Sequence, residues 1–247
     1  MIQFARPISI CASVVFSLLY TVSASAYIFG PPNVTELAEP GQSANNLSIF
    51  TRTEEDPLSG AGSKSESKGI AGVVKNGDKS GAGTFMYRLS QNSSTTSTLT
   101  RDGTDFGFGL GGEWNLLSDR SLGLIANFQY DAGYWEYTKG STNTGTALTL
   151  GGEIGGIYRI FVETVTIAPF VMYNQFYSSY RITPATGADW SLYNKGGSTS
   201  FGVGIIAGKF TVSFTQTRSN SEISNSYNSA TSKTSTDGTM LTLGVNF

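Results

Sequence analysis

Long segments in which apolar and polar side chains alternate residue by residue constrain this chain most strongly. In the segment from Gly103 to Leu116, one face carries Phe106, Phe108, Leu110, Trp114 and Leu116. The other face carries Asp105, Gly107, Gly109, Gly111, Glu113 and Asn115. A period of two predicts a β-strand with two different faces. The segment exceeds the usual strand of about 5–6 residues and is long enough for the about 9–11 residues with which a strand crosses a bilayer.

The same alternation recurs along the C-terminal two thirds of the chain. It predicts eight strands, at 81–91, 103–116, 121–137, 145–159, 164–181, 198–207, 209–218 and 237–247. Very short connections near 117–120, 160–163 and 208 alternate with longer, Ser/Thr/Asn/Gly-rich connections at 91–102, 138–144, 182–197 and 218–237. Short turns at one end and long loops at the other are typical of an outer-membrane barrel, with the short turns in the periplasm.

Alternation alone does not distinguish a membrane barrel from a soluble β-sandwich, because both have one apolar face. In a sandwich the exposed face carries many Lys and Glu residues, whereas here only 14% of all residues are charged and the polar face is mostly small residues. Small polar side chains suit the narrow interior of a barrel. Aromatic residues near strand ends suit the interfacial girdles; they are Trp114, Tyr134, Tyr158, Tyr173, Tyr177 and Phe210. The sequence therefore predicts an all-β, closed, antiparallel up-and-down transmembrane barrel, and a secreted sandwich is the alternative.

Residues 27–80 are open to two interpretations. Tyr27–Ser43 contains three prolines and is expected to be irregular. Leu47–Arg52 and Gly69–Lys75 could form one extra hairpin, which would give a ten-stranded barrel, still an even number. Otherwise the segment is a periplasmic or lumen-plugging extension of a barrel formed by residues 81–247. Because both stretches are short and alternate poorly, the sequence favours eight strands, with ten as the alternative.

The N-terminus has the pattern of a secretory signal peptide. Arg6 supplies a positive charge, a mostly apolar stretch runs from Ile8 to Leu19, and Ala24-Ser25-Ala26 is a small-x-small cleavage site. Cleavage near Ala26 would separate residues 1–26 from the mature protein. The sequence's single cysteine, Cys11, lies within this segment, so the mature chain would have neither a disulfide nor a thiolate metal site.

The C-terminal residues alternate up to a final aromatic side chain. The residues concerned are Leu241, Leu243, Val245 and Phe247. This ending resembles the β-signal of bacterial outer-membrane proteins, which implies recognition by the barrel-assembly machinery. The strand pattern from Gly81 onward resembles the small eight-stranded barrels typified by outer membrane protein A and its X-type relatives. These resemblances imply a location in the bacterial outer membrane, with its lipid as the surrounding partner.

Several charged residues fall on the polar, inward-facing side of the predicted strands. They are Arg88, Asp105, Glu113, Asp131, Glu153 and Lys209. Buried charges must be paired, so we expect a polar network that fills the interior, with Arg88 facing Asp105 if the first hairpin has a simple register. The alternative is a polar gate or ion path.

The residue types argue against catalysis. Histidine is absent, which excludes Ser-His and Cys-His nucleophiles and His-ligated metals; the known barrel enzymes resemble one another in depending on a histidine. Gly107-x-Gly109-x-x-Gly112 matches a dinucleotide-binding pattern but lies inside a predicted strand. Glu113 and Glu153 could suggest a glycosidase pair, but they lie on non-adjacent strands. No cofactor or metal site is expected, and a net charge of −2 gives no reason to expect nucleic acid.

The hydroxyl-rich segments Ser93–Thr98 and Ser219–Ser235 are predicted to lie in the long loops. Function concentrates in such loops. The leading hypothesis is a non-enzymatic structural or surface-interaction protein whose outer loops contact an extracellular ligand. A narrow channel for ions or small solutes is the second hypothesis, and an enzyme that uses only carboxylates and hydroxyls is the third.

Overall fold

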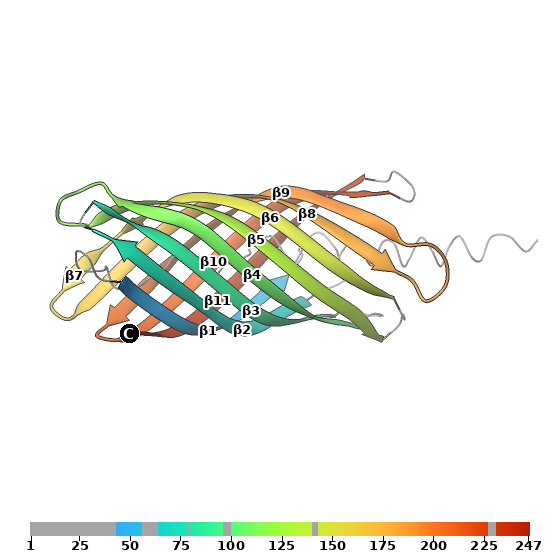
Figure 1. The fold of residues 1–247 in the computed structure, drawn as a ribbon, viewed down its shortest axis with the longest axis horizontal. Coiled ribbons are helices and arrows are strands. Elements are labelled where there is room, and N and C mark those ends of the chain that lie inside the picture. Colours follow the sequence, from blue (N-terminus) through green and yellow to red (C-terminus); the bar gives the residue numbers. More distant parts are fainter. Residues whose placement is uncertain (1–42, 56–63, 79, 96–99, 140–142, 227–230) are drawn as a thin grey trace, which may run out of the picture.

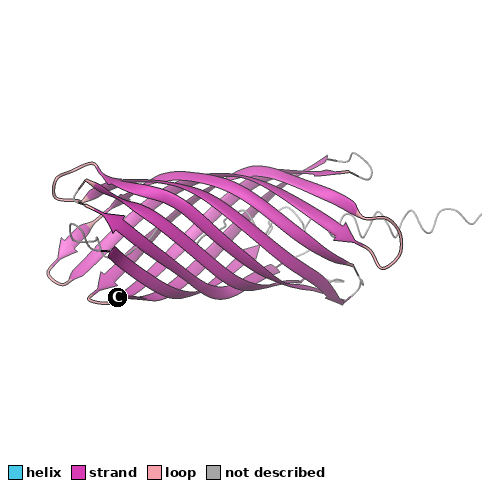
Figure 2. Ribbon diagram, viewed as in Figure 1, coloured by secondary structure: helices cyan, strands magenta, loops and turns pink. Residues whose placement is uncertain are grey.

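The computed structural model describes residues 43–55, 64–78, 80–95, 100–139, 143–226 and 231–247. The predicted signal peptide and its cleavage site lie outside these residues. Every regular element within them is a β-strand (Figure 2). Across the same residues, no helix is long and apolar enough to span a bilayer.

The strands follow one another around a closed cylinder (Figure 1). They are β1 (Ser43–Glu55), β2 (Lys64–Gly77), β3 (Gly81–Thr95), β4 (Thr100–Asn115), β5 (Leu122–Lys139), β6 (Thr144–Tyr158), β7 (Ile160–Val162), β8 (Val165–Thr183), β9 (Trp190–Ala207), β10 (Phe210–Asn225) and β11 (Thr231–Asn246). All neighbouring strands pair antiparallel, and β1 pairs with β11 while β6 pairs with β8. These two pairings close the barrel. The short β7 pairs only with the start of β8.

The barrel has ten strands among the described residues, with β7 outside the ring. The closed up-and-down barrel is therefore confirmed, but eight strands is wrong and the ten-stranded alternative is correct. The difference lies in β1 and β2, which contain 13 and 14 residues. Apolar and polar residues alternate clearly only in the first half of β1 and the second half of β2, which lie at the same end of the barrel as the C-terminus. Farther along, outward Thr51 and Lys68 are as polar as inward Arg52 and Ser67, so the period-two contrast disappears.

Short turns lie at one end of the barrel and the other connections lie at the opposite end, as predicted, but the strands are longer than expected. Turns at Asp78–Ser80, Leu116–Ser121, Glu163–Thr164 and Gly208–Lys209 lie at one end, together with the C-terminus (Figure 1). At the other end, the connection expected at 182–197 shortens to 184–189 because β9 already begins at Trp190. Most of the predicted loop Ser219–Ser235 is likewise strand in β10 and β11. We call the end with the C-terminus the turn end and the other the outer end.

Apolar side chains face away from the barrel axis and form a belt around it. Phe106, Leu124 and Val245 are 52%, 37% and 43% exposed, so they do not pack in a common core. The predicted girdle residues are also exposed; they are Trp114, Tyr134, Tyr158, Tyr173, Tyr177 and Phe210. An outward apolar band flanked by aromatic rings is typical of barrels that cross a membrane.

Four apolar clusters lie inside the described part of the barrel, and the two larger ones interrupt its polar lining. The two smaller clusters pair Val73 with Met86 and Phe50 with Met240. Near the turn end, Ile125 and Ile157 pack with Phe170 and Met172. Near the outer end, Trp135 and Tyr180 pack with Ile182, Leu192 and Ile223, which are at most 5% exposed. We call these the inner cluster and the outer cluster. The inner cluster draws on β5, β6, β8 and β9, and the outer cluster draws on β5, β8, β9 and β10. That side of the interior is therefore filled by apolar side chains at two levels.

Candidate functional site

The inward faces of the strands build a polar interior with two different halves. On β1 to β6, the inward side chains include charged residues such as Arg52, Lys75 and Glu113. On β8 to β11, the buried polar side chains are amides and hydroxyls. They are Asn174, Ser178, Asn194, Ser198, Ser200, Thr211, Ser213, Thr215, Ser219, Asn225, Thr234, Thr236 and Asn246. The sequence places them at alternate positions, so each strand contributes one column of side chains to the interior.

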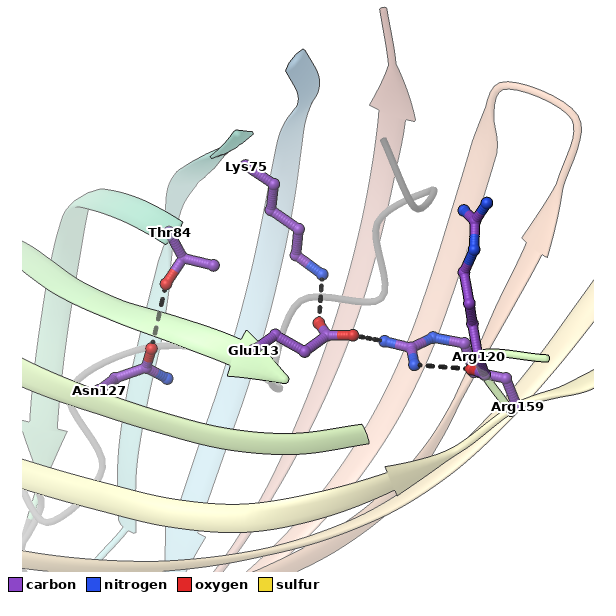
Figure 3. A network of polar contacts seen from close by, with 6 residues as sticks. All are labelled: Lys75, Thr84, Glu113, Arg120, Asn127 and Arg159. Atoms are coloured by element: carbon purple, nitrogen blue, oxygen red, sulfur yellow. Dashed lines mark hydrogen bonds and ion pairs between the residues drawn. The ribbon is translucent and has the colours of Figure 1, made fainter. Parts of the chain in front are cut away.

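Glu113 is held between two cations at the turn end of the interior (Figure 3). Its Oε2 lies 2.8 Å from Lys75 Nζ, and its Oε1 contacts Arg159 Nη2. Arg159 also donates from Nη1 to the backbone oxygen of Arg120, at 3.3 Å. The three ion-pairing side chains are at most 3% exposed. Because both carboxylate oxygens have a cationic partner, this cluster satisfies the requirement that buried charges be paired.

A second set of pairings lies closer to the outer end. Arg88 contacts Asp131, and Asn92 contacts Asp105. The expected pairing of Arg88 with Asp105 is wrong. In the observed register Arg88 lies opposite Gly107 and Asp105 lies opposite Ser90, so the arginine reaches across the glycine to the next strand.

Glu153 binds an amide instead of a cation. Asn127 donates from Nδ2 to Glu153 Oε1 at 2.6 Å, and accepts from Thr84 Oγ1 at 3.2 Å. Thr84, Asn127 and Glu153 lie on β3, β5 and β6, so Asn127 links three strands inside the barrel. Figure 3 shows the contact between Thr84 and Asn127 near the Glu113 cluster. Glu113 and Glu153 therefore have different partners and do not face a common groove.

Lys209 is not part of the interior. It lies in the Gly208–Lys209 turn between β9 and β10, and it is exposed. The expectation that Lys209 faces inward is wrong, because residue 209 does not belong to a strand. Gly208 instead adopts a φ of 57°, a left-handed conformation that suits a tight turn, and β10 begins at Phe210.

Sequence reasoning missed four interior charges. They are Lys75, Arg159, Arg52 and Glu54, and each is at most 6% exposed. Arg159 and Glu153 are an even number of positions apart in the predicted strand 145–159, so their side chains face the same side. This spacing could have identified Arg159 as an inward residue. Lys75, Arg52 and Glu54 lie on the β1–β2 hairpin. The weak alternation of this hairpin does not show from the sequence which side chains face inward.

Two carboxylates stabilise the short turns at the turn end. Asp78 accepts hydrogen bonds from Ser80 Oγ at 2.5 Å and from Ser80 N at 2.7 Å, and these bonds lower the pKa of Asp78. Asp119 accepts from Ser121 N at 2.9 Å and from Ser121 Oγ at 2.7 Å, which lowers the pKa of Asp119 in the same way. Each side chain closes an Asx-type turn.

The residues of the predicted assembly signal lie on the outside of β11. Leu241, Leu243 and Val245 are 42%, 45% and 43% exposed and belong to the apolar belt. Phe247 is 70% exposed, and its backbone nitrogen donates to Asn45 O at 3.1 Å. The C-terminal residue is therefore tied to β1 by its backbone while its ring remains free.

The arrangement offers little for chemistry. The Gly107-x-Gly109-x-x-Gly112 pattern lies within β4, so it does not open a helix as a dinucleotide site requires. Within the described ranges, no group of three or more acidic, Cys or His residues could hold a metal ion. A cavity of about 40 Å³ among Arg88, Asp131 and Trp135 has room for a few water molecules. The geometry provides an interior with paired charges at Glu113 and Asp131, whereas other buried polar groups, such as the amide of Asn194, have no hydrogen-bond partner within the described part of the protein.

Comparison with known proteins supports the fold class. No protein-family model matches the sequence, and no curated protein matches it. Among solved structures, the chain resembles the β domain of the Bordetella autotransporter BrkA with a TM-score of 0.51 and 10% identity, over 83% of this chain and 98% of that one. The outer membrane protease OmpT from Escherichia coli gives a TM-score of 0.49 and 12% identity, over 85% and 97%.

A match to a larger protein covers less than half of that protein. Against the ferric citrate transporter FecA the TM-score is 0.38 with 10% identity, over 86% of this chain, and the chain spans 44% of that protein's length. At these identities the likeness concerns the fold. The chain has the same closed-barrel fold as the bacterial outer-membrane β domain of BrkA.

Proposed function

We propose that this protein is a non-enzymatic barrel of the bacterial outer membrane, whose outer end presents a rigid polar surface to an extracellular ligand. The observation that carries this proposal is the continuation of paired strands beyond the apolar belt. Outward Asn220 and Glu222 on β10 and Lys233 on β11 follow the apolar positions of the same strands. The polar surface is therefore built on strands, which hold side chains more precisely than loops do.

The interior of this outer extension is packed, which makes the surface rigid. Ser219 Oγ lies 2.5 Å from Thr236 Oγ1, and Ser221 Oγ lies 2.9 Å from Thr234 Oγ1. Ile223 is fully buried in the outer cluster. A surface that is already ordered loses little conformational entropy when it binds a partner.

Three pairs of oppositely charged side chains lie on the outer surface. Arg181 Nη2 lies 2.8 Å from Asp189 Oδ2, Lys195 Nζ lies 3.5 Å from Glu222 Oε1, and Lys64 Nζ lies 2.8 Å from Glu66 Oε1. With charges balanced in this way, hydroxyls, amides and aromatic rings remain to contact a ligand. A neutral, hydrogen-bonding ligand such as a glycan or a polar protein surface suits this composition better than a polyanion.

A narrow channel is the second candidate, because ten strands enclose a wider interior than eight and this interior is polar. The Lys75–Glu113–Arg159 cluster and the outer cluster oppose this function, since both fill the interior. An enzyme is the least supported candidate, because the chain has no histidine and its buried carboxylates are held by structural partners.

Two measurements test the proposal. The barrel, refolded into planar bilayers, should produce no steady single-channel steps; regular steps would establish the channel instead. In nanodiscs, the barrel should bind a component of a glycan array or of an immobilised matrix-protein panel. Replacing the outward amide and hydroxyl residues Asn220, Thr231 and Ser235 together by Ala should abolish that binding, whereas Leu243→Ala in the belt should leave it unchanged.

A further inference from the structure

The apolar belt is uneven around the barrel. On β5 the outward positions stay apolar far along the strand; they are Leu122, Leu124, Ala126, Phe128, Tyr130, Ala132 and Tyr134. On β10 the outward run ends after Phe210, Val212 and Phe214, and Gln216 and Arg218 follow. On the adjacent β11, Asp237 and Thr239 face outward beyond Leu241.

The polar residues of β10 and β11 lie at a depth where β5 is apolar. A strand rises about 3.3 Å per residue and tilts by about 40° in such barrels, so Arg218 stands about 20 Å above Phe210. The apolar band of an outer-membrane barrel is about 25 Å tall. On β5, Tyr130 follows Leu122 at the same spacing as Arg218 follows Phe210 on β10. Ala132 and Tyr134 lie farther along β5 and are still apolar or aromatic. Lipid chains are a poor environment for the side chains of Arg218 and Asp237.

These residues line a groove on the outside of the barrel. The groove has a volume of about 660 Å³ and crosses β9, β10, β11 and β1. Phe201 contributes an apolar wall, while Gln216, Arg218, Asp237 and Thr239 contribute polar groups. A hollow that combines an aromatic side chain with hydrogen-bonding groups has the composition of a protein contact surface.

Arg218 and Asp237 form an ion pair in this groove, so the groove carries one positive and one negative charge side by side. Arg218 Nε lies 2.8 Å from Asp237 Oδ1 and Arg218 Nη2 lies 3.0 Å from Asp237 Oδ2. The two side chains are nevertheless 71% and 47% exposed. They are direct register partners on neighbouring strands, so they stand side by side as seen from outside. A two-fold axis parallel to the barrel axis reverses this order in a second copy.

We propose that the outer face of β9, β10, β11 and β1 is the interface of a two-fold symmetric dimer within the membrane. In this dimer the guanidinium of Arg218 meets the carboxylate of Asp237 in the second copy, and the reverse contact forms as well. Such an isologous interface uses the same patch on both subunits. The four charges then alternate and are shielded from lipid. An anionic lipid headgroup fits less well, because Asp237 already neutralises Arg218. This inference goes beyond the proposed function and does not depend on the ligand.

Cysteine cross-linking in intact outer membranes tests the interface. In a Cys11→Ser background the sequence has no other cysteine, so Thr239→Cys places one thiol near the proposed axis. The matched control is Thr146→Cys, an exposed outward threonine on β6. An oxidant or a short bis-maleimide should convert most Thr239→Cys chains to a covalent dimer and leave Thr146→Cys monomeric. Equal cross-linking of the two variants would contradict the proposal.

A charge-swap experiment separates contacts between copies from the contact within one chain. Arg218→Asp and Asp237→Arg should each lower the dimer fraction at least tenfold, because like charges would meet across the interface. The two variants mixed before insertion should form a heterodimer, since the introduced carboxylate of one variant then meets the introduced guanidinium of the other. Heat-modifiable migration on gels reports that each variant is folded. Folded variants that stay monomeric when mixed, or dimerise as the wild type does when alone, would overturn the proposal.

Discussion

Thr84 and Asn127 hydrogen-bond over the backbone of Gly111, although they lie on strands that are not neighbours. The distance from Thr84 Oγ1 to Asn127 Oδ1 is 3.2 Å, and Gly111 is the register partner of both residues on the intervening strand β4. Arg88 reaches Asp131 over Gly107 in the same way. The glycines of β4 therefore allow side chains of β3 and β5 to meet inside the barrel.

Gly111→Ala should destabilise the barrel by about 1–3 kcal/mol, the usual cost of overpacking. A Cβ at this position would lie 2.0 Å from Asn127 Oδ1 and 2.3 Å from the backbone oxygen of Ala126. The measurement is the urea midpoint of unfolding in detergent. Gly152→Ala is the control, because its nearest atom would be 3.9 Å away. Equal midpoints for the two variants would contradict this account.

Glu113→Gln should lower the free energy of unfolding by about 3–5 kcal/mol, because it leaves two buried cations without a carboxylate. Lys75 and Arg159 both depend on Glu113. Glu136→Gln, on the exposed outer face of β5, should change the stability by less than about 0.5 kcal/mol. Denaturant titration of the two variants measures the difference, and a small effect at Glu113 would mean that water screens the cluster.

Phe128→Arg tests whether the apolar belt contacts lipid. Phe128 lies in the middle of the apolar run of β5 and is 55% exposed. An arginine near the membrane midplane costs about 2–4 kcal/mol, so reversible folding into lipid vesicles should weaken by this amount. Thr138→Arg, beyond the belt on the same face, should be nearly neutral. Similar stabilities for both variants would argue against lipid at Phe128.

Phe247→Ala should impair assembly in cells without lowering stability, because the backbone hydrogen bond from residue 247 to Asn45 O remains. The ring is 70% exposed, so its loss removes little packing, whereas the resemblance to a β-signal implies that the assembly machinery recognises it. Cell fractionation should show less barrel in the outer membrane, while refolding in detergent stays normal. Phe210→Ala, at the same end and 68% exposed, is the control and should assemble as the wild type does. Equal losses for both would show a general effect of lost aromatics.

The Asp119 turn should give a defined pH dependence. Hydrogen bonds from Ser121 lower the pKa of Asp119 in the folded state, and the unfolded value is about 3.9. The ionised carboxylate therefore contributes stability that is complete above the unfolded pKa and is lost as the pH falls through the folded pKa. The stability difference between wild type and Asp119→Asn should shrink as the pH falls below about 4. Ser121→Ala should reduce this dependence, and a difference that stays constant with pH would contradict the assignment.

The alternation of residue types along the chain is enough to predict the fold class and the direction of most side chains. From Phe106 to Trp114, outward residues form part of the apolar belt and inward residues line the polar interior, so apolar side chains alternate with polar or small ones. This contrast identified the strand, its two faces and the inward position of Glu113. The alternation is sufficient to predict this strand because the outer surface and the interior of the barrel favour different side chains.

The strand count, the strand lengths and the partners in the interior depend on how the strands pair in three dimensions. Beyond the belt both faces are polar, so the pattern that reveals a strand fades along β1, β2 and the outer parts of β9 to β11. The pairing of Arg88 with Asp131 depends on register, on the absence of a side chain at Gly107 and on the curvature that brings β3 toward β5. These are relations between strands, and the order of residues along one strand does not contain them.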